Sequence, residues 1–253
     1  MNWRAKLYQQ GQALAVAIQF MTLLPIKLEP YPDAPTQGYS VLYYPMVGAI
    51  IGALLFLLFA LTQHAPPNLQ AALIILLWVV MTGALHLDGL ADTADGWLGG
   101  VGDKARTLKI MKDPHIGVAG VIALILCLLL KWVALTEIIQ GQPDAMVVLI
   151  LIPLVARWYA LLLLSYTPYA QPQGIAMTLT VHQPKKAILA WAIGGVIVLA
   201  SLSWLWLMIT SSLVLGLRKM FLQRLQGTTG DTLGASIECV EICLLVCCVL
   251  FPL

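Results

Sequence analysis

The sequence predicts an all-α fold, a polytopic membrane bundle of about seven transmembrane helices preceded by an amphipathic N-terminal helix. Hydrophobic residues make up 60% of the 253 residues and charged residues only 10%, whereas soluble domains contain about 25% charged residues. Charge-free runs cover residues 34–87, 114–130 and 187–217. A helix of roughly 20 apolar residues crosses a bilayer and bonds its own backbone. The composition excludes a soluble globular or disordered chain, and a net charge of +2 argues against nucleic-acid binding.

The distribution of basic residues predicts how the chain crosses the membrane. The 187–217 run is either one tilted helix or two helices bent near Ser201–Ser203. Two helices place all flanking basic residues on the cytoplasmic side, as the positive-inside rule requires. The expected spans are 41–63, 70–87, 116–136, 146–165, 187–201, 203–217 and 233–252. We treat residues 1–253 as a single transmembrane catalytic domain, with 1–35 as an interfacial segment and 88–115 as a cytoplasmic active-site loop.

Two smaller features complete the expected architecture. Tyr44-Pro45, with Gly48 and Gly52, gives the first span a small-residue surface that is suited to close helix packing. Beyond the membrane, Asp103 is expected to cap a short helix that Pro114 ends.

An acidic segment follows the second expected span. If a helix continues through it, Asp88, Asp92 and Asp95 lie on one face with i, i+4, i+7 spacing. Close carboxylates repel one another, and Mg²⁺, which prefers carboxylates together with phosphate oxygens, relieves that repulsion. We therefore predict these three residues as metal ligands, against the alternative of a solvated helix end. His86, just before them, is predicted to act in catalysis as a ligand or hydrogen-bond donor.

Basic residues follow the acidic segment in the chain. Arg106 and Lys109 lie one turn apart on the expected short helix, followed by Lys112 and Asp113. Cations beside a metal site suit an anionic diphosphate, so we predict substrate binding there. Ordinary positive-inside loop charges are the alternative interpretation.

A third cluster opens the last span. Asp231, Glu238 and Glu241 descend one helix behind the glycine-rich sequence Gly227-Thr-Thr-Gly230. Ionisable groups at membrane depth are costly and usually functional. We predict that either Asp231 or Glu238 is the catalytic base, and that Gly230 and Glu241 contact the substrate. Arg157, inside the fourth span, binds either substrate or, in a purely structural pair, a buried glutamate.

These residues together resemble the signature of the cobalamin synthase (adenosylcobinamide-GDP ribazoletransferase) family. The resemblance rests on His86-Leu-Asp88-Gly-Leu-Ala-Asp92-Thr-Ala-Asp95-Gly96, on Arg106 to Asp113 with Gly117, on Gly230-Asp231 with Gly234, Glu238 and Glu241, and on Gln19-Phe20 with Pro25. It implies a bacterial enzyme of the cytoplasmic (inner) membrane that depends on Mg²⁺. Such an enzyme joins α-ribazole, or its 5′-phosphate, to adenosylcobinamide-GDP, releasing GMP and forming adenosylcobalamin or its 5′-phosphate. Membrane lipid is the expected surrounding, and a homo-oligomer is left open.

Two rival functions remain at this point. Asp92-x-x-Asp95-Gly96 is also similar to the start of the CDP-alcohol phosphotransferase motif of phospholipid synthesis. That motif continues differently, because Trp97-Leu-Gly-Gly100 follows here and no second acid pair stands on the next helix. The other rival is a transporter in which Glu238, Glu241 and Arg157 form an ion path.

Overall fold

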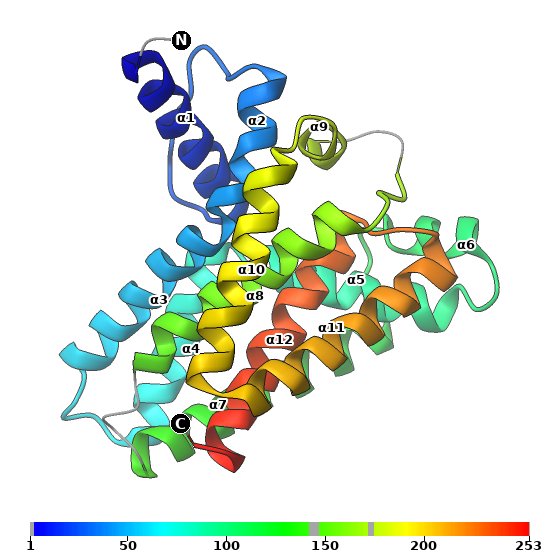
Figure 1. Ribbon diagram of the computed structural model, residues 1–253. Helices are drawn as coiled ribbons and strands as arrows, with labels where there is room; N and C mark the ends of the chain where they lie inside the picture. The colour runs from blue at the N-terminus through cyan, green and yellow to red at the C-terminus, as the bar shows by residue number, and fades with distance from the viewer. Residues whose placement is uncertain (1–2, 142–146, 172–174, 253) are drawn as a thin grey trace.

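The computed structural model describes residues 3–141, 147–171 and 175–252, and the regular structure of these residues is helical (Figure 1). A lone bridge between Tyr169 and Thr228 is its sole extended pairing within those ranges. The helices are α1 (Trp3–Met21), α2 (Ala34–Ser40), the 3₁₀ turn η1 (Val41–Tyr43), α3 (Tyr44–Leu61), α4 (Pro67–Thr82), α5 (Leu85–Gly99), α6 (Lys104–Ile110), α7 (Val118–Gly141), α8 (Val148–Tyr166), α9 (Ile175–Val181), α10 (Lys185–Leu202), α11 (Trp204–Leu225) and α12 (Gly230–Leu250).

The all-α membrane architecture is confirmed. Among the residues that the structure describes, six elements are long and apolar enough to cross a bilayer: the continuous stretch Ala34–Leu61, then α7, α8, α10, α11 and α12. The pair α4 and α5, bent by 86°, gives a seventh if it counts as one span. Residues 187–217 form two helices, because the chain is extended at Ser203, whose side chain accepts a hydrogen bond from the Trp206 amide at 3.3 Å.

The second predicted span is wrong at its end, because α4 stops at Thr82 rather than at residue 87. Gly83 and Ala84 both have positive φ angles, 61° and 57°, and this left-handed conformation ends a helix. The chain then turns sharply into α5. Segment 88–115, expected to lie outside the spans, is largely helical in α5 and α6, in agreement with the expected acidic helix face and the short helix that Asp103 caps. The acidic residues therefore lie on a helix whose axis is bent by 86° from the axis of α4.

The centre of the bundle is α8, against which α3 packs very closely. A Cβ atom placed on Gly48 would lie 2.6 Å from the carbonyl carbon of Pro153, and one on Gly52 would lie 2.6 Å from the Ile150 Cα. The predicted small-residue packing surface of the first span is thus confirmed. Direct backbone contact brings Tyr44, at the start of α3, into the buried centre of the protein.

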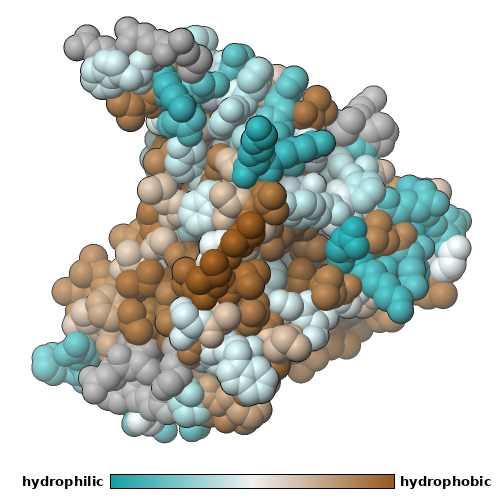
Figure 2. All heavy atoms as spheres, viewed as in Figure 1, coloured by the Kyte–Doolittle hydropathy of each residue, from teal (hydrophilic) through white to brown (hydrophobic). Residues whose placement is uncertain are grey.

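Apolar and polar side chains separate on the surface. Figure 2 shows a brown apolar region over the lower part of the bundle and teal polar side chains over its upper and right-hand parts. The start of α10, the end of α11 and α6 lie toward the polar end, away from the C-terminus (Figure 1). Exposed apolar residues on α10 include Leu189, Ile193 and Ile197. Such a surface fits a hydrocarbon solvent.

Gly52→Ala is expected to destabilise the protein by about 1–3 kcal/mol, because the added methyl group overpacks the contact with the α8 backbone. Gly194→Ala on α10 is the matched control, since its methyl group would meet no atom within 4 Å. Denaturant unfolding in detergent measures both variants. Equal stability of the two variants would contradict the packing argument.

Candidate active site

Three acidic side chains line α5 as expected, but they have different surroundings. Asp88 is exposed, and Asp92 and Asp95 are partly buried. The Asp95 carboxylate accepts hydrogen bonds from the backbone N–H groups of Gly117, at 2.7 Å, and Gly120, at 2.9 Å. Asp95 thereby satisfies backbone donors at the start of α7 that would otherwise be unpaired. It ties α5 to α7, while Asp88 and Asp92 make no such bond among the described residues.

The start of α12 meets α5 at Gly89. A Cβ atom on Gly89 would lie 2.6 Å from the carbonyl oxygen of Asp231, so only glycine allows this approach. The Asp92 carboxylate consequently experiences electrostatic repulsion from three other carboxylates, those of Asp88, Asp95 and Asp231. The positive charge of the Lys112 ammonium interacts with Asp231. The fold thus gathers four carboxylates and one cation from distant parts of the sequence.

A cavity of about 250 Å³ is bordered by two of these carboxylates, those of Asp88 and Asp231. Four predicted site residues line it: His86, Asp88, Gly230 and Asp231. The remaining walls were not predicted from the sequence and are mainly apolar or aromatic, namely Phe20, Met21, Tyr44, Leu85, Ala160, Tyr169, Leu233, Gly234 and Ile237. The cavity therefore has an acidic side and an aromatic side, which suits a ligand with one polar and one apolar part.

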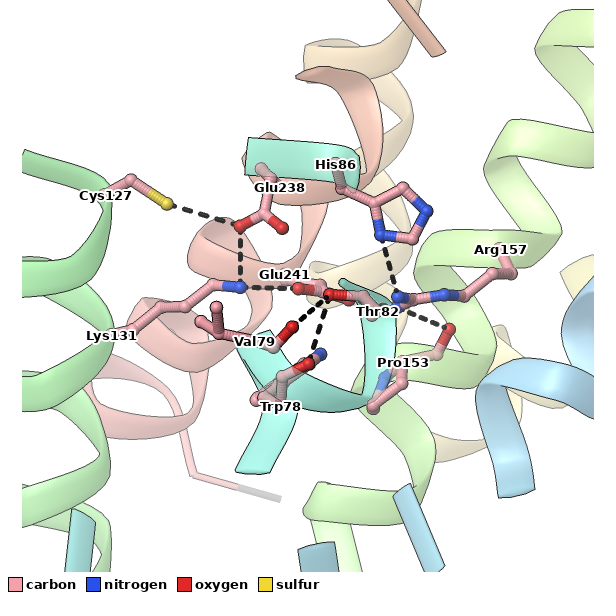
Figure 3. A network of polar contacts seen from close by, with 10 residues as sticks. All are labelled: Trp78, Val79, Thr82, His86, Cys127, Lys131, Pro153, Arg157, Glu238 and Glu241. Atoms are coloured by element: carbon pink, nitrogen blue, oxygen red, sulfur yellow. Dashed lines mark hydrogen bonds and ion pairs between the residues drawn. The ribbon is translucent and has the colours of Figure 1, made fainter. Parts of the chain in front are cut away.

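Behind His86 lies a buried network of charges (Figure 3). Lys131 of α7 contacts Glu238 at 2.7 Å and Glu241 at 2.6 Å, and its ammonium lies 4.4 Å from the centre of the Trp78 ring. Arg157 of α8 pairs with the other Glu241 oxygen. Two cations and two carboxylates compensate one another, as buried charges must.

The network joins four helices through side chains alone. The His86 Nδ1 atom of α5 lies 3.2 Å from Arg157 Nη2, and the Cys127 thiol of α7 donates to Glu238 at 3.3 Å. Arg157, Glu238 and Glu241 are buried and do not line the cavity. Of the two interpretations of Arg157, the structural Arg–Glu pair is the one that the contacts support.

Lys131 is the principal residue that sequence reasoning missed. It is the only charged residue in the predicted span 116–136, and a lone charge at membrane depth signals a specific partner. That signal was available in the sequence, but the identity of the partners, more than 100 residues away, was not.

The basic residues predicted to bind substrate, on α6 and just after it, lie at the surface. Asp103 caps α6 as predicted, accepting hydrogen bonds from the amides of Ala105, at 2.8 Å, and Arg106, at 3.1 Å. The side chains of Arg106, Lys109 and Lys112 are exposed and form no ion pair with any residue that the structure describes. They are thus available to an anionic ligand.

Asp113 and the glycine-rich sequence are already engaged within the protein. The Asp113 carboxylate accepts bonds from the His115 amide, at 3.0 Å, and contacts its ring nitrogen at 2.7 Å. These contacts, the backbone bond foremost, lower the pKa of Asp113. The N–H groups of Thr228 and Thr229 bond to Pro168 O and Thr232 Oγ1, both at 2.8 Å. Gly227-Thr-Thr-Gly230 therefore mainly builds the capped start of α12.

The sequence model of the cobalamin-5-phosphate synthase family matches residues 13–249. The chain belongs to this family. No solved structure matches the chain.

Relatives of known name agree with the family match. The chain is 48% identical over 236 residues to the adenosylcobinamide-GDP ribazoletransferase of Stutzerimonas stutzeri, an alignment that covers 92% of this chain and 96% of that protein. Identity is 47% over 240 residues to the protein of the same name from Pseudomonas paraeruginosa, with 93% and 96% covered. It is 44% over 235 residues to the one from Acinetobacter baumannii strain ACICU, with 91% and 94% covered.

Lys131→Met is expected to destabilise the protein by about 3–5 kcal/mol, because it leaves the buried Glu238 carboxylate without a cation. Adding Glu238→Gln removes the leftover charge and should recover at least half of the loss. Denaturant unfolding of the detergent-solubilised single and double variants measures the effect.

Lys219→Met, at an exposed position of α11, is the matched control and should change the stability little. If Glu238→Gln deepens the loss caused by Lys131→Met, charge compensation is not what Lys131 provides.

Proposed function

We propose that this chain is a membrane-embedded phosphotransferase that joins α-ribazole, or its 5′-phosphate, to adenosylcobinamide-GDP. GMP is released, and adenosylcobalamin or its 5′-phosphate is formed. The proposal is carried by the family match over residues 13–249, which includes the acidic α5 and the start of α12 that together border one cavity. Neither CDP-alcohol phosphotransfer nor transport is favoured by that match.

We propose Mg²⁺ as the cofactor, held by Asp92 together with Asp88. Mg²⁺ sites commonly use one or two carboxylates plus substrate phosphate oxygens and water, so a complete protein cage is not required. No three His, Cys, Asp or Glu side chains converge on one metal position in the described part of the chain. The mutual repulsion of the carboxylates around Asp92 nevertheless fits a divalent cation. When bound, the ion supplies charge neutralisation at the diphosphate.

Asp231 is assigned as the general base. A hydroxyl oxygen of the acceptor forms a bond to the cobinamide-side phosphorus, and the bond from that phosphorus to the bridging oxygen of GMP breaks. The hydroxyl proton passes to Asp231, which borders the cavity and is partly buried. Glu238, the alternative candidate for the base, is already paired with Lys131. His86, between the cavity and Arg157, orients the ligand by hydrogen bonding.

The donor phosphates are assigned to Lys112, Arg106 and Lys109. Lys112 already interacts with Asp231, and the other two side chains extend from the neighbouring α6 into solvent. Phosphoryl transfer needs charge stabilisation more than covalent chemistry. We place this basic end of the bundle in the cytoplasm of a bacterium, in accordance with the positive-inside rule.

Asp92→Asn is expected to lower GMP release by about 100-fold or more, the effect of losing one essential electrostatic contact at a reacting group. The purified variant is assayed with adenosylcobinamide-GDP and α-ribazole phosphate. Asp103→Asn is the matched control, because asparagine also caps a helix, and it should retain near-normal turnover. Full Mg²⁺-dependent turnover by Asp92→Asn would refute the metal assignment.

Chelation of divalent cations is expected to abolish GMP release by the wild-type protein, and Mg²⁺ should restore it. Ca²⁺ should restore much less, because it is larger and prefers more oxygen ligands at longer distances. Turnover that persists after chelation and dialysis would contradict the proposed cofactor.

A further inference from the structure

The aromatic side of the cavity has no role in the mechanism above. Phe20 at the end of α1 and Tyr44 at the start of α3 stack with ring centroids 6.3 Å apart and planes inclined by 11°. Tyr169 lines the same cavity and lies near Asp231. Two helix ends and one loop thus supply an aromatic wall directly beside the proposed general base.

The Tyr44 hydroxyl is the most unusual group in that wall. The side chain is only 1% exposed, and its hydroxyl has no hydrogen-bond partner among the described residues. A buried hydroxyl without a partner is costly, and most such groups in proteins are satisfied. Because Tyr44 lines the cavity, a ligand that carries a hydrogen-bond acceptor can satisfy this hydroxyl.

We propose that the aromatic side of the cavity binds the benzimidazole ring of the ribazole acceptor, and that the Tyr44 hydroxyl donates a hydrogen bond to its free ring nitrogen. This inference rests on the proposed function and makes Tyr44 a specificity-determining residue. The ring stacks against Phe20 and Tyr44, and the attached ribose extends toward Asp231 and Asp88. The acceptor hydroxyl then lies beside the base that takes its proton.

The guanine ring of the donor is the other nitrogen heterocycle in the reaction, and it fits this wall less well. Guanine carries several donors and acceptors on one edge, and burial without partners for them is unfavourable. At this end of the cavity the polar side-chain groups are the Tyr44 and Tyr169 hydroxyls. The other side chains there carry only carbon and sulfur atoms: Phe20, Met21, Ala160 and Ile237. A benzimidazole has a single free ring nitrogen, which one hydroxyl satisfies.

The test compares ribazole with an analogue in which indole replaces benzimidazole, so that a C–H group replaces the free nitrogen. The wild-type protein should have a KM about tenfold lower for ribazole than for the indole analogue, the usual effect of one hydrogen bond. Tyr44→Phe should raise the KM for ribazole about tenfold, leave kcat and the KM for the donor nearly unchanged, and abolish the discrimination. A change in KM alone marks binding that is equal in ground and transition states.

Tyr43→Phe is the matched control, because the Tyr43 hydroxyl donates to Gln10 Oε1 at 2.6 Å and does not face the cavity. It should discriminate as the wild type does. Unchanged discrimination in Tyr44→Phe, or a raised KM for adenosylcobinamide-GDP instead, overturns the inference. If Tyr44→Phe does not fold, equal KM values for ribazole and the indole analogue in the wild type overturn it. Absence of GMP release by the wild type would refute the proposed function instead.

Discussion

Compensation of charge inside a hydrocarbon solvent is the constraint on which the rest of this structure depends. Lys131, Arg157, Glu238 and Glu241 come from three helices, and each is almost completely buried. Separating any one of them from its partners leaves an uncompensated charge, which costs far more than an intact pair contributes. The network therefore fixes α7, α8 and α12 relative to one another. His86 joins α5 to the same network. The network therefore also positions the parts of α5, α8 and α12 that line the cavity.

The bend between α4 and α5 serves the site in a second way. Ala84 adopts a left-handed conformation that costs an L-residue about 1–2 kcal/mol, and such strain persists where the surroundings impose it. A straight continuation of α4 would carry the acids onward along the axis of that helix, without the 86° bend. The turn instead sets α5 against α7 and α12, where Asp95 bonds the start of α7 and Gly89 allows the start of α12 to approach closely.

These two features divide the ionisable residues by role. The glutamates of α12 hold the helices together at membrane depth, whereas Asp231, about two to three turns earlier on the same helix, lines the cavity. The cavity in turn separates an acidic side from an aromatic side. This division suits a reaction between a charged diphosphate and a largely apolar nucleoside, because each substrate meets surroundings of its own polarity.

The sequence by itself determined the solvent, the helical class and the acids, because composition and i, i+4, i+7 spacing act within one segment. It also predicted the break near Ser203 and the cap at Asp103. Only the tertiary structure decided that Glu238 pairs with Lys131, that Asp95 supports α7 and that Tyr44 lines the cavity. Each of these depends on contacts between residues far apart in the chain. Close packing of the helices selects those contacts, and no local pattern of residues encodes them.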